Sequence, residues 1–399
     1  MLRGAICRSE GRNHGCDLWR SENPPHGARR DTLNASLSQI VRSPILLEPN
    51  RVWRFYRGGR MIDLFKHNVT REDSFFPEEW VGSTVQAVNP GDHFKAGEGL
   101  TLISNDLARP VTLKSVIEAF PEEMLGTRHV KAHGTNAALL AKLLDTATRL
   151  TIHAHPDRQF AERHLHSCYG KTEAWFVLET RPEVEDPYVL IAFKEEVSRQ
   201  DYRLMLDRQD IPGLMRVLHR VSVRPGDVVY VRAGLPHAIG EGVFMVELQE
   251  PTDFSIILER LCAGFTFNEQ ESFMGLDPTV ALSAIDHRVY SEQEVRAELL
   301  ITPRVLRFEG ESKEVELLGC ETTECFAGHR LEVKGMLQDD SGRRSSILIV
   351  LDGKGTLKHH HGEIPLRRGV ELFIPAAAGE HLFVSTSGMS VFKCLPALS

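Results

Sequence analysis

The stretch RLTIHAHPD, residues 149–157, decides the fold that we expect, because it reads as a β-strand carrying two histidines. In a strand, side chains at positions i and i+2 face the same way, so His153 and His155 project together from one face. Further along the chain come short β-rich runs closed by glycine, proline or charged residues: KTEAWFVLE (171–179), YVLIAFK (188–194), VVYVRAG (228–234) and VFMVELQ (243–249). Their spacing is typical of an antiparallel barrel or sandwich.

A second β series with the same rhythm follows residue 290. It consists of RVLRFEG (304–310), HRLEVKGML (329–337), SSILIVLDGKGTL (345–357), VELFIPAA (370–377) and HLFVST (381–386). We therefore expect a mainly β protein with two β-barrels in tandem.

Two segments have helical character. Residues 198–221 read as a helix, a Pro212-Gly213 break and a second short helix, which predicts a helical insertion between strands of the first barrel. Residues from about 137 to 148 place four leucines at a spacing that favours a short helix or turn packed against a core.

The chain divides into three parts on these grounds. Residues 1–43 contain seven arginines and few periodic apolar positions, so we expect a disordered extension that builds no core. Residues 44–290 are the predicted first domain with its helical insertion, and residues 291–399 are the predicted second domain.

Composition limits the classes of function. A net charge of -8 opposes general attraction to nucleic acid or to an anionic membrane. The seven cysteines are irregularly spaced, as in a chain without a disulfide framework, and no apolar run is long enough for a membrane helix or a signal peptide. We expect a cytoplasmic protein whose partner is a small molecule, and the oligomeric state stays open.

The two histidines belong to a larger set that predicts a metal site. Strand parity places Lys171, Glu173 and Trp175 on one face of their strand. The run RPGDVVYVRAGLPHAIG, residues 224–240, has a Gly-Asp turn, a short strand and a G-x-x-H step that delivers His237. Three imidazoles, from His153, His155 and His237, and one carboxylate, from Glu173, make a ligand set that suits Zn²⁺ first, and also Mn²⁺, Fe²⁺ or Co²⁺.

These motifs resemble those of the type I phosphomannose isomerases of the cupin superfamily. LTIHAHPD is similar to the family's LSIQVHPD segment, GKTEAW to its GKTE-aromatic segment, and RAGLPHAIG to its PAGTPHAIG segment. Lys142, thirteen positions before His155, and ELQEPTD at 247–253 follow the family's order and spacing. The resemblance covers roughly residues 45–399, since the runs SSILIVLDGKGTL and LFIPAAAG are similar to the family's C-terminal cupin.

The resemblance implies a fold, an activity and roles for named residues. The fold would be two tandem cupin (jelly-roll) barrels, and the activity the metal-dependent interconversion of mannose 6-phosphate and fructose 6-phosphate or a closely related sugar. His155, Glu173 and His237 would be metal ligands, with His153 in place of a glutamine ligand. The residues that match the family's active-site lysines and acids are Lys142, Lys171, Glu247 and Asp253. We also expect burial and a nearby cation to lower the pKa of these lysines.

One position departs from the family in a way that bears on function. Where many members carry an arginine, this chain has Ile257. An isoleucine side chain has no positive charge with which to stabilise a negative charge on a sugar oxygen. Arg232 is a candidate replacement that would bind substrate near the mouth of the pocket. The alternative to an isomerase is a metal-binding cupin that binds a sugar without turnover, or one that acts on a different sugar, whether phosphorylated or unphosphorylated.

A second histidine group has a plainer interpretation. The run His359-His360-His361 precedes Gly362, which predicts a solvated hairpin turn. Because only His381 stands near the expected ligand position of the second barrel, we expect that barrel to hold no metal.

Overall fold

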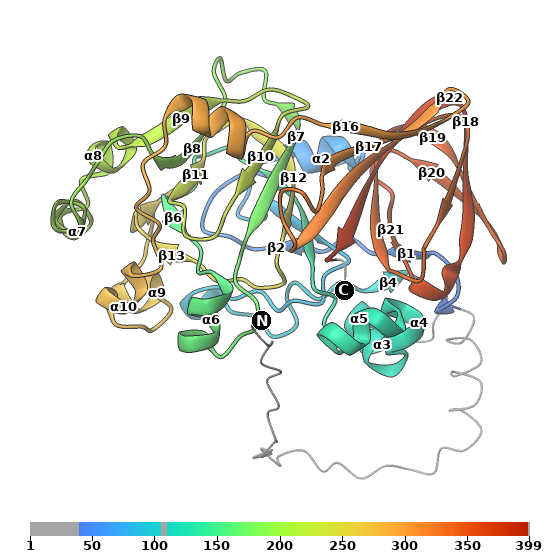
Figure 1. Ribbon diagram of the computed structural model, residues 1–399, viewed down its shortest axis with the longest axis horizontal. Helices are drawn as coiled ribbons and strands as arrows, with labels where there is room; N and C mark the ends of the chain where they lie inside the picture. Colours follow the sequence, from blue (N-terminus) through green and yellow to red (C-terminus); the bar gives the residue numbers. More distant parts are fainter. Residues whose placement is uncertain (1–39, 105–109, 398–399) are drawn as a thin grey trace, which may run out of the picture. The chain divides into compact units, whose positions relative to one another are not determined.

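The strands predicted from the sequence are present in the computed structural model, which describes residues 40–104 and 110–397 and is shown in Figure 1. All pairings between its named strands are antiparallel, as expected for a mainly β chain. The extension predicted for residues 1–43 lies, up to residue 39, outside the described residues.

Two sheets from the first two thirds of the chain carry the predicted site. The six-stranded sheet has the order β10 (Val228–Val231), β7 (Glu173–Thr180), β12 (Val243–Gln249), β5 (Leu140–Asp145), β3 (Glu78–Val81) and β2 (Arg51–Val52). The five-stranded sheet has the order β13 (Ile256–Ile257), β6 (His153–Ala154), β11 (His237–Ile239), β8 (Tyr188–Phe193) and β9 (Leu218–Ser222). A small hairpin joins β14 (Leu261–Cys262) to β15 (Phe265–Thr266).

The C-terminal third forms most of a nine-stranded sheet. Its order is β16 (Arg304–Glu309), β17 (Ser312–Leu318), β18 (Phe326–Asp340), β22 (Glu380–Pro396), β19 (Ser346–His359), β21 (Glu371–Ile374), β1 (Ile45–Leu47) and β4 (Ile103–Ser104), with β20 (Gly362–Arg367) paired to β19. The β19–β20 hairpin turns at the histidine run and confirms the turn predicted there. Strands β1 and β4 come from residues 44–290, the predicted first domain, yet they pair within the sheet built mainly by residues 291–399. The bounds 44–290 and 291–399 therefore stay predictions.

Short helices lie between the strands along the chain. They are α2 (Arg60–Phe65), α3 (Leu113–Ala119), α4 (Pro121–Leu125), α5 (Thr127–His133), α6 (Arg158–Leu165), α7 (Arg199–Arg208), α8 (Ile211–Arg216), α9 (Glu269–Ser272), α10 (Pro278–Leu282) and α11 (Glu292–Glu294). Helices α7 and α8 lie between β8 and β9, on the side of the molecule away from the nine-stranded sheet (Figure 1). None of the described helices is long and apolar enough to cross a membrane.

The prediction of a helix or turn at about 137–148 is wrong, because this segment contains strand β5. All six residues of β5 are buried, since the strand lies between β12 and β3 inside the sheet and both of its faces are covered. A strand buried on both faces lacks alternation of apolar and polar residues, so its leucines can match a helical spacing.

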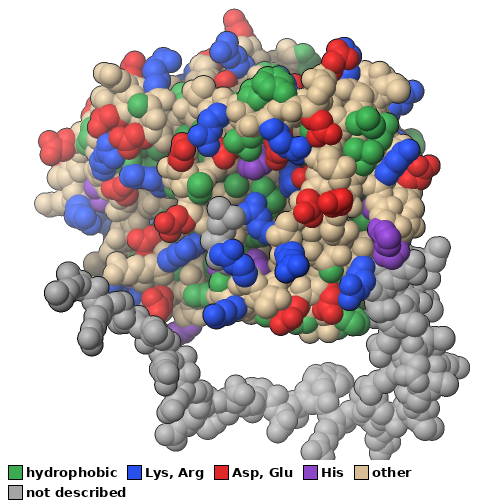
Figure 2. All heavy atoms as spheres, turned by 45° about the vertical axis from the view of Figure 1, so that its right-hand side comes forward, with side chains coloured by type: hydrophobic (Ala, Val, Ile, Leu, Met, Phe, Trp, Pro, Cys, Tyr) green, Lys and Arg blue, Asp and Glu red, His purple; other side chains and the backbone are tan. Residues whose placement is uncertain are grey.

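The core joins the six-stranded and nine-stranded sheets. Phe176 of β7 meets Phe392 of β22 edge to face, with ring centroids 4.7 Å apart, and both side chains are buried. On the face shown in Figure 2, basic and acidic side chains are interspersed, so this face of the described residues carries no large field of one sign.

Candidate metal centre

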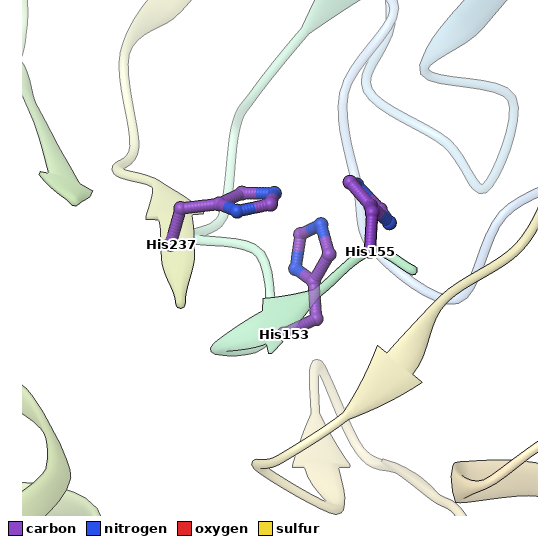
Figure 3. Close-up of side chains that lie close together, drawn as sticks. All are labelled: His153, His155 and His237. Carbon is purple, nitrogen blue, oxygen red and sulfur yellow. The ribbon is translucent and has the colours of Figure 1, made fainter. Parts of the chain in front are cut away.

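Two histidines on adjacent strands and a third just after the end of β6 converge at one point, as Figure 3 shows. His153 on β6 is paired directly with His237 on β11, and His155 follows two residues after His153. Their ligand atoms all lie within 4.8 Å of one another, and all three side chains are buried. The i, i+2 spacing read from the sequence therefore does bring His153 and His155 together.

Backbone carbonyl groups fix the tautomer of each imidazole. The Nδ1 atoms of His153, His155 and His237 lie 2.9, 2.8 and 2.7 Å from the carbonyl oxygens of Thr151, Phe254 and Leu235. A carbonyl only accepts, so each Nδ1 carries the hydrogen and each Nε2 keeps its lone pair. This arrangement is the usual second contact of a metal-binding histidine.

Glu173 and Lys171 complete the cluster. The carboxylate of Glu173 lies 3.1 Å from His155 Nε2 and 3.4 Å from His237 Nε2, and it accepts a hydrogen bond from Trp175 Nε1 at 3.0 Å. Lys171 Nζ is 2.7 Å from both His155 Nε2 and Glu173 Oε2. Burial alone would raise the pKa of Glu173, but Lys171 and His155 hold it well below its ordinary value, so the carboxylate is ionised.

The cluster fits a divalent metal ion. Burial, reinforced by neighbouring charge, lowers the pKa of His155 and of His237 to about 3, so both are neutral donors at pH 7. The buried Nε2 of His237 has no hydrogen-bond partner among the described residues, which leaves an acceptor aimed into the cluster. Three imidazole nitrogens and a carboxylate oxygen are a common donor set for zinc and its neighbours.

A cavity of about 450 Å³ opens beside this cluster. Its lining includes charged side chains from several strands and loops, namely Arg54, Glu78, Lys142, Lys171, Glu173, Glu247 and Asp253. The volume lies in the range of small-molecule sites. The four residues predicted from the family's active site therefore all face one cavity, together with His153 and Ile257.

Strand register pairs Lys142 with Glu247. The two residues lie opposite each other on β5 and β12, and Lys142 Nζ donates to Glu247 Oε1 at 2.8 Å. Burial raises the pKa of Glu247, although Lys142 partly offsets that rise. The expected lowering of the pKa of Lys142 is wrong: burial lowers it, but Glu247 and Glu78 outweigh burial and the net shift is upward.

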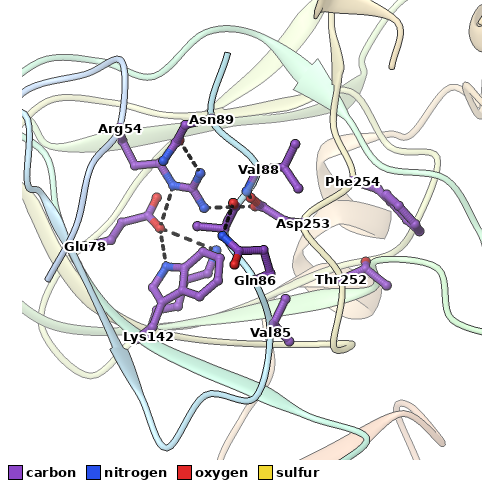
Figure 4. A network of polar contacts seen from close by, with 12 residues as sticks. Arg54, Glu78, Val85, Gln86, Val88, Asn89, Lys142, Thr252, Asp253 and Phe254 are labelled. Atoms are coloured by element: carbon purple, nitrogen blue, oxygen red, sulfur yellow. Dashed lines mark hydrogen bonds and ion pairs between the residues drawn. The ribbon is translucent and has the colours of Figure 1, made fainter. Parts of the chain in front are cut away.

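Arg54 and Glu78 are cavity residues that the sequence analysis missed. Arg54 donates to Glu78 Oε2 at 3.1 Å, to Asn89 Oδ1 at 2.9 Å and to Asp253 Oδ1 at 2.9 Å, as Figure 4 shows. The only signal in the sequence was a charged residue inside an apolar run, as in RVWRFY and PEEWVG, whose burial could not be read without the fold.

Arg232 lies elsewhere. Its guanidinium contacts the hydroxyl of Tyr290 and lies 3.5 Å from Asp286, and Arg232 is not among the residues that line the cavity. Ile257 on β13 is paired with His153 on β6 and lines the cavity, so the apolar side chain stands directly beside the histidine cluster.

Comparison with known proteins identifies the relatives of this chain. The mannose-6-phosphate isomerase ManA of Bacillus subtilis is 24% identical over 287 residues, which cover 71% of this chain and 81% of the relative. The mannose-6-phosphate isomerase of Streptococcus mutans is 26% identical over 217 residues, 53% of this chain and 59% of the relative. This chain is similar to proteins named mannose-6-phosphate isomerase.

Solved structures of phosphomannose isomerases share the fold. The crystal structure of the Bacillus subtilis mannose 6-phosphate isomerase superposes with a TM-score of 0.68 at 21% identity and covers 88% of this chain and 99% of that chain. A phosphomannose isomerase from Salmonella typhimurium, solved as a variant with an arginine replaced by alanine, gives a TM-score of 0.66 at 16% identity, with 89% and 100% covered. No family model matches this chain.

Proposed function

We propose that the protein is a metal-dependent aldose-ketose isomerase that interconverts mannose 6-phosphate and fructose 6-phosphate or a closely related sugar. The observation that carries this proposal is one cavity whose lining includes His153 and Glu173 of the histidine cluster together with the Lys142–Glu247 pair. A site that only binds a sugar has no need for a buried acid-base pair beside a group of candidate metal ligands. The names of the relatives point to the same reaction.

The cluster residues would hold one divalent ion, with zinc as our first choice. When bound, such an ion would align and polarise the two sugar oxygens at the reacting carbons. The remaining acid, base and substrate-binding groups would come from ionisable side chains of the chain itself. These side chains are buried at the cavity, and each is paired with a neighbour of opposite charge. We infer also that the first cupin barrel, within residues 44–290, is catalytic and that the second, within 291–399, holds no metal.

The proton transfers fall to the side chains beside the cluster. From aldose to ketose, a base removes the proton on C2 and returns it to C1, while the O2 hydroxyl loses a proton and O1 gains one. Glu247 is the base that we propose, because burial raises its pKa toward neutrality and brings it closer to the working pH. Lys142, hydrogen-bonded to Glu247, positions the carboxylate, and Lys171 is placed to exchange protons with sugar oxygens near the cluster.

The test combines metal analysis with a turnover assay. The zinc-loaded protein is expected to convert mannose 6-phosphate and to exchange the C2 proton of the sugar with solvent. Lys171→Ala is expected to lose turnover while metal content is retained. Binding of the sugar phosphate without any C2 proton exchange would show a sugar-binding cupin instead of an isomerase.

A further inference from the structure

Arg54 is held rigidly at the wall of the cavity. It is buried, its guanidinium carbon lies 4.9 Å above the Trp80 ring, and its partners Glu78, Asn89 and Asp253 come from three separate segments. The second oxygen of Asp253 accepts from the backbone N–H of Val88 at 2.8 Å, so Asp253 is itself fixed. Side chains on several elements thus set the direction of one guanidinium (Figure 4).

The guanidinium still has capacity to donate. Its contacts use one N–H on each nitrogen, and each terminal nitrogen carries a second N–H. A planar guanidinium fixed in this way suits the oxygens of a phosphate or of neighbouring hydroxyls. Arg54 therefore combines rigid placement with unused donors.

The other cations of the described cavity lining are engaged near the cluster. Lys142 donates to Glu247 at 2.8 Å, and Lys171 lies 2.7 Å from both His155 and Glu173. Arg232 lies outside the cavity, and Ile257 contributes no charge. Among the described residues that line the cavity, Arg54 is thus the arginine available to a substrate oxygen.

We propose that Arg54 is a substrate-binding residue of this cavity and supplies the fixed positive charge that Ile257 does not. This inference rests on the proposed function for its substrate, a sugar phosphate. Arg54 lies in the segment just after β2, whereas Ile257 lies on β13. The positive charge of Arg54 is therefore supplied by a different part of the fold from the one that carries Ile257.

The competing explanation is that Arg54 only neutralises Glu78 and Asp253. Arg181 offers a matched control, because it is also buried and also bonded to two carboxylates, those of Asp73 and Asp145, yet it does not line the cavity. A purely structural role predicts the same outcome for Arg54→Gln and Arg181→Gln, namely lower thermal stability without a selective effect on substrate affinity.

The experiment measures kcat and KM for mannose 6-phosphate on zinc-loaded full-length protein, together with metal content and Tm. Arg54→Gln is expected to raise KM about ten- to hundredfold with a smaller change in kcat and unchanged metal content, as for loss of a charged hydrogen bond. Arg54→Lys is expected to fall between the wild type and Arg54→Gln, because an ammonium lacks the planar fork. Arg181→Gln is expected to lower Tm and leave KM unchanged.

A compensating substitution separates binding from structure. Ile257→Arg in the Arg54→Gln background is expected to recover at least half of the lost affinity on a logarithmic scale, since it returns a cation to the cavity but none to Glu78 or Asp253. Recovery of KM supports the proposal; no recovery, or an Arg54→Lys and Arg54→Gln pair with wild-type KM, overturns it. If Arg54→Gln does not fold, the KM values of Arg54→Lys and of Arg54→Lys with Ile257→Arg are compared instead.

The proposed function and this inference can fail separately. If the wild type shows no turnover, calorimetric binding of mannitol 6-phosphate, which has no carbonyl to isomerise, replaces the kinetic readout. Weaker binding by Arg54→Lys or Arg54→Gln than by the wild type would then support the role of Arg54 while the isomerase proposal falls. Absence of binding to the wild type would overturn the role of Arg54 as well.

Discussion

His237 gains its chemistry from its immediate surroundings. Its Nδ1 hydrogen is committed to the carbonyl of Leu235, and its Nε2 lone pair is buried without a partner among the described residues. Burying an unpaired acceptor costs about 1–3 kcal/mol. A metal ion bound by His153, His155 and His237 would remove that cost, so the apo protein is expected to be less stable than the metal-loaded one.

We predict that His155→Ala abolishes metal binding and lowers turnover at least about hundredfold, because it removes one donor of the cluster. Metal analysis after dialysis and a mannose 6-phosphate assay check this. The matched control is His381→Ala, since His381 is likewise buried and lies 3.2 Å from a carboxylate, that of Asp339 in the nine-stranded sheet. Metal retained by His155→Ala, or lost by His381→Ala, would contradict the ligand assignment.

At the scale of elements, strand register brings together charged residues that are far apart in the sequence, which spacing along one strand cannot do. The central strands β5, β12 and β7 place Lys142 opposite Glu247 and Glu247 opposite Trp175. A slip of one residue would turn Glu247 to the other face of its strand and break the pair. The chemistry of the cavity therefore depends on pairing between segments about a hundred residues apart.

We predict that Lys142→Met lowers kcat about 10²- to 10⁴-fold and moves the acid limb of the kcat/KM profile to higher pH. Lys142 lowers the pKa of Glu247, so its removal lets burial raise that pKa further, and the base then stays protonated to a higher pH. The residual activity measured across pH checks the shift. Lys393→Met, which removes a buried lysine paired with Asp339 at 2.6 Å, is the control and should leave the profile in place.

An acid limb that moves to lower pH in Lys142→Met would contradict Glu247 as the titrating base. An unchanged limb with reduced kcat would assign the base to another group.

At the scale of the whole molecule, buried charges join two sheets. Lys66, just after α2, contacts Glu79 of β3 in the six-stranded sheet and lies 2.9 Å from Glu371 of β21 in the nine-stranded sheet. Burial and the neighbouring Glu79 raise the pKa of Glu371 from about 4.5 to about 8. One ammonium thus bridges two carboxylates, of which one holds a proton at neutral pH.

We predict that the free energy of unfolding falls as pH rises from about 4.5 to about 8, in part because of Glu371. In this window the unfolded chain has released a proton that the folded chain keeps, so the folded state binds more protons and loses stability as pH rises. Glu371→Gln stays neutral and should remove this contribution, so its stability relative to the wild type should improve by at least about 1 kcal/mol between pH 5 and pH 9.

Urea unfolding at both pH values measures the difference. Glu363→Gln on β20 is the control, because Glu363 is exposed and should show the same pH dependence as the wild type. A Glu371→Gln difference that shrinks or reverses toward pH 9 would contradict the prediction.

The shared core carries a second prediction at this scale. Phe392→Ala should lower the free energy of unfolding by about 3–5 kcal/mol, because it empties space between Phe176 and the nine-stranded sheet. Phe308→Ala, at a side chain that is 72% exposed, should change stability by less than about 0.5 kcal/mol. Denaturant unfolding of both variants checks the pair, and equal losses would show that the Phe176–Phe392 contact is not part of the core.

The strands in the two predicted β series and the proximity of His153 to His155 were predictable, since both follow from local rules. Period-2 geometry puts His153 and His155 on one face whatever the rest of the chain does. The glycine and proline turns bounded the other runs, and the hairpin at His359 was predicted from its neighbours alone. Strand β5 was not predictable in this way, because burial on both faces removes the alternation that identifies a strand.

The sequence by itself determined the mainly β character of the protein and the convergence of His153 and His155, because short-range periodicity and side-chain chemistry suffice for both. Only the tertiary structure decided which charges meet in the cavity. Arg54 reaches Asp253 across 199 positions, and Lys142 reaches Glu247 across 105. Such contacts arise when sheets pack and exclude water, and burial then sets the pKa of Glu247 and the role of Arg54 in ways that no local pattern encodes.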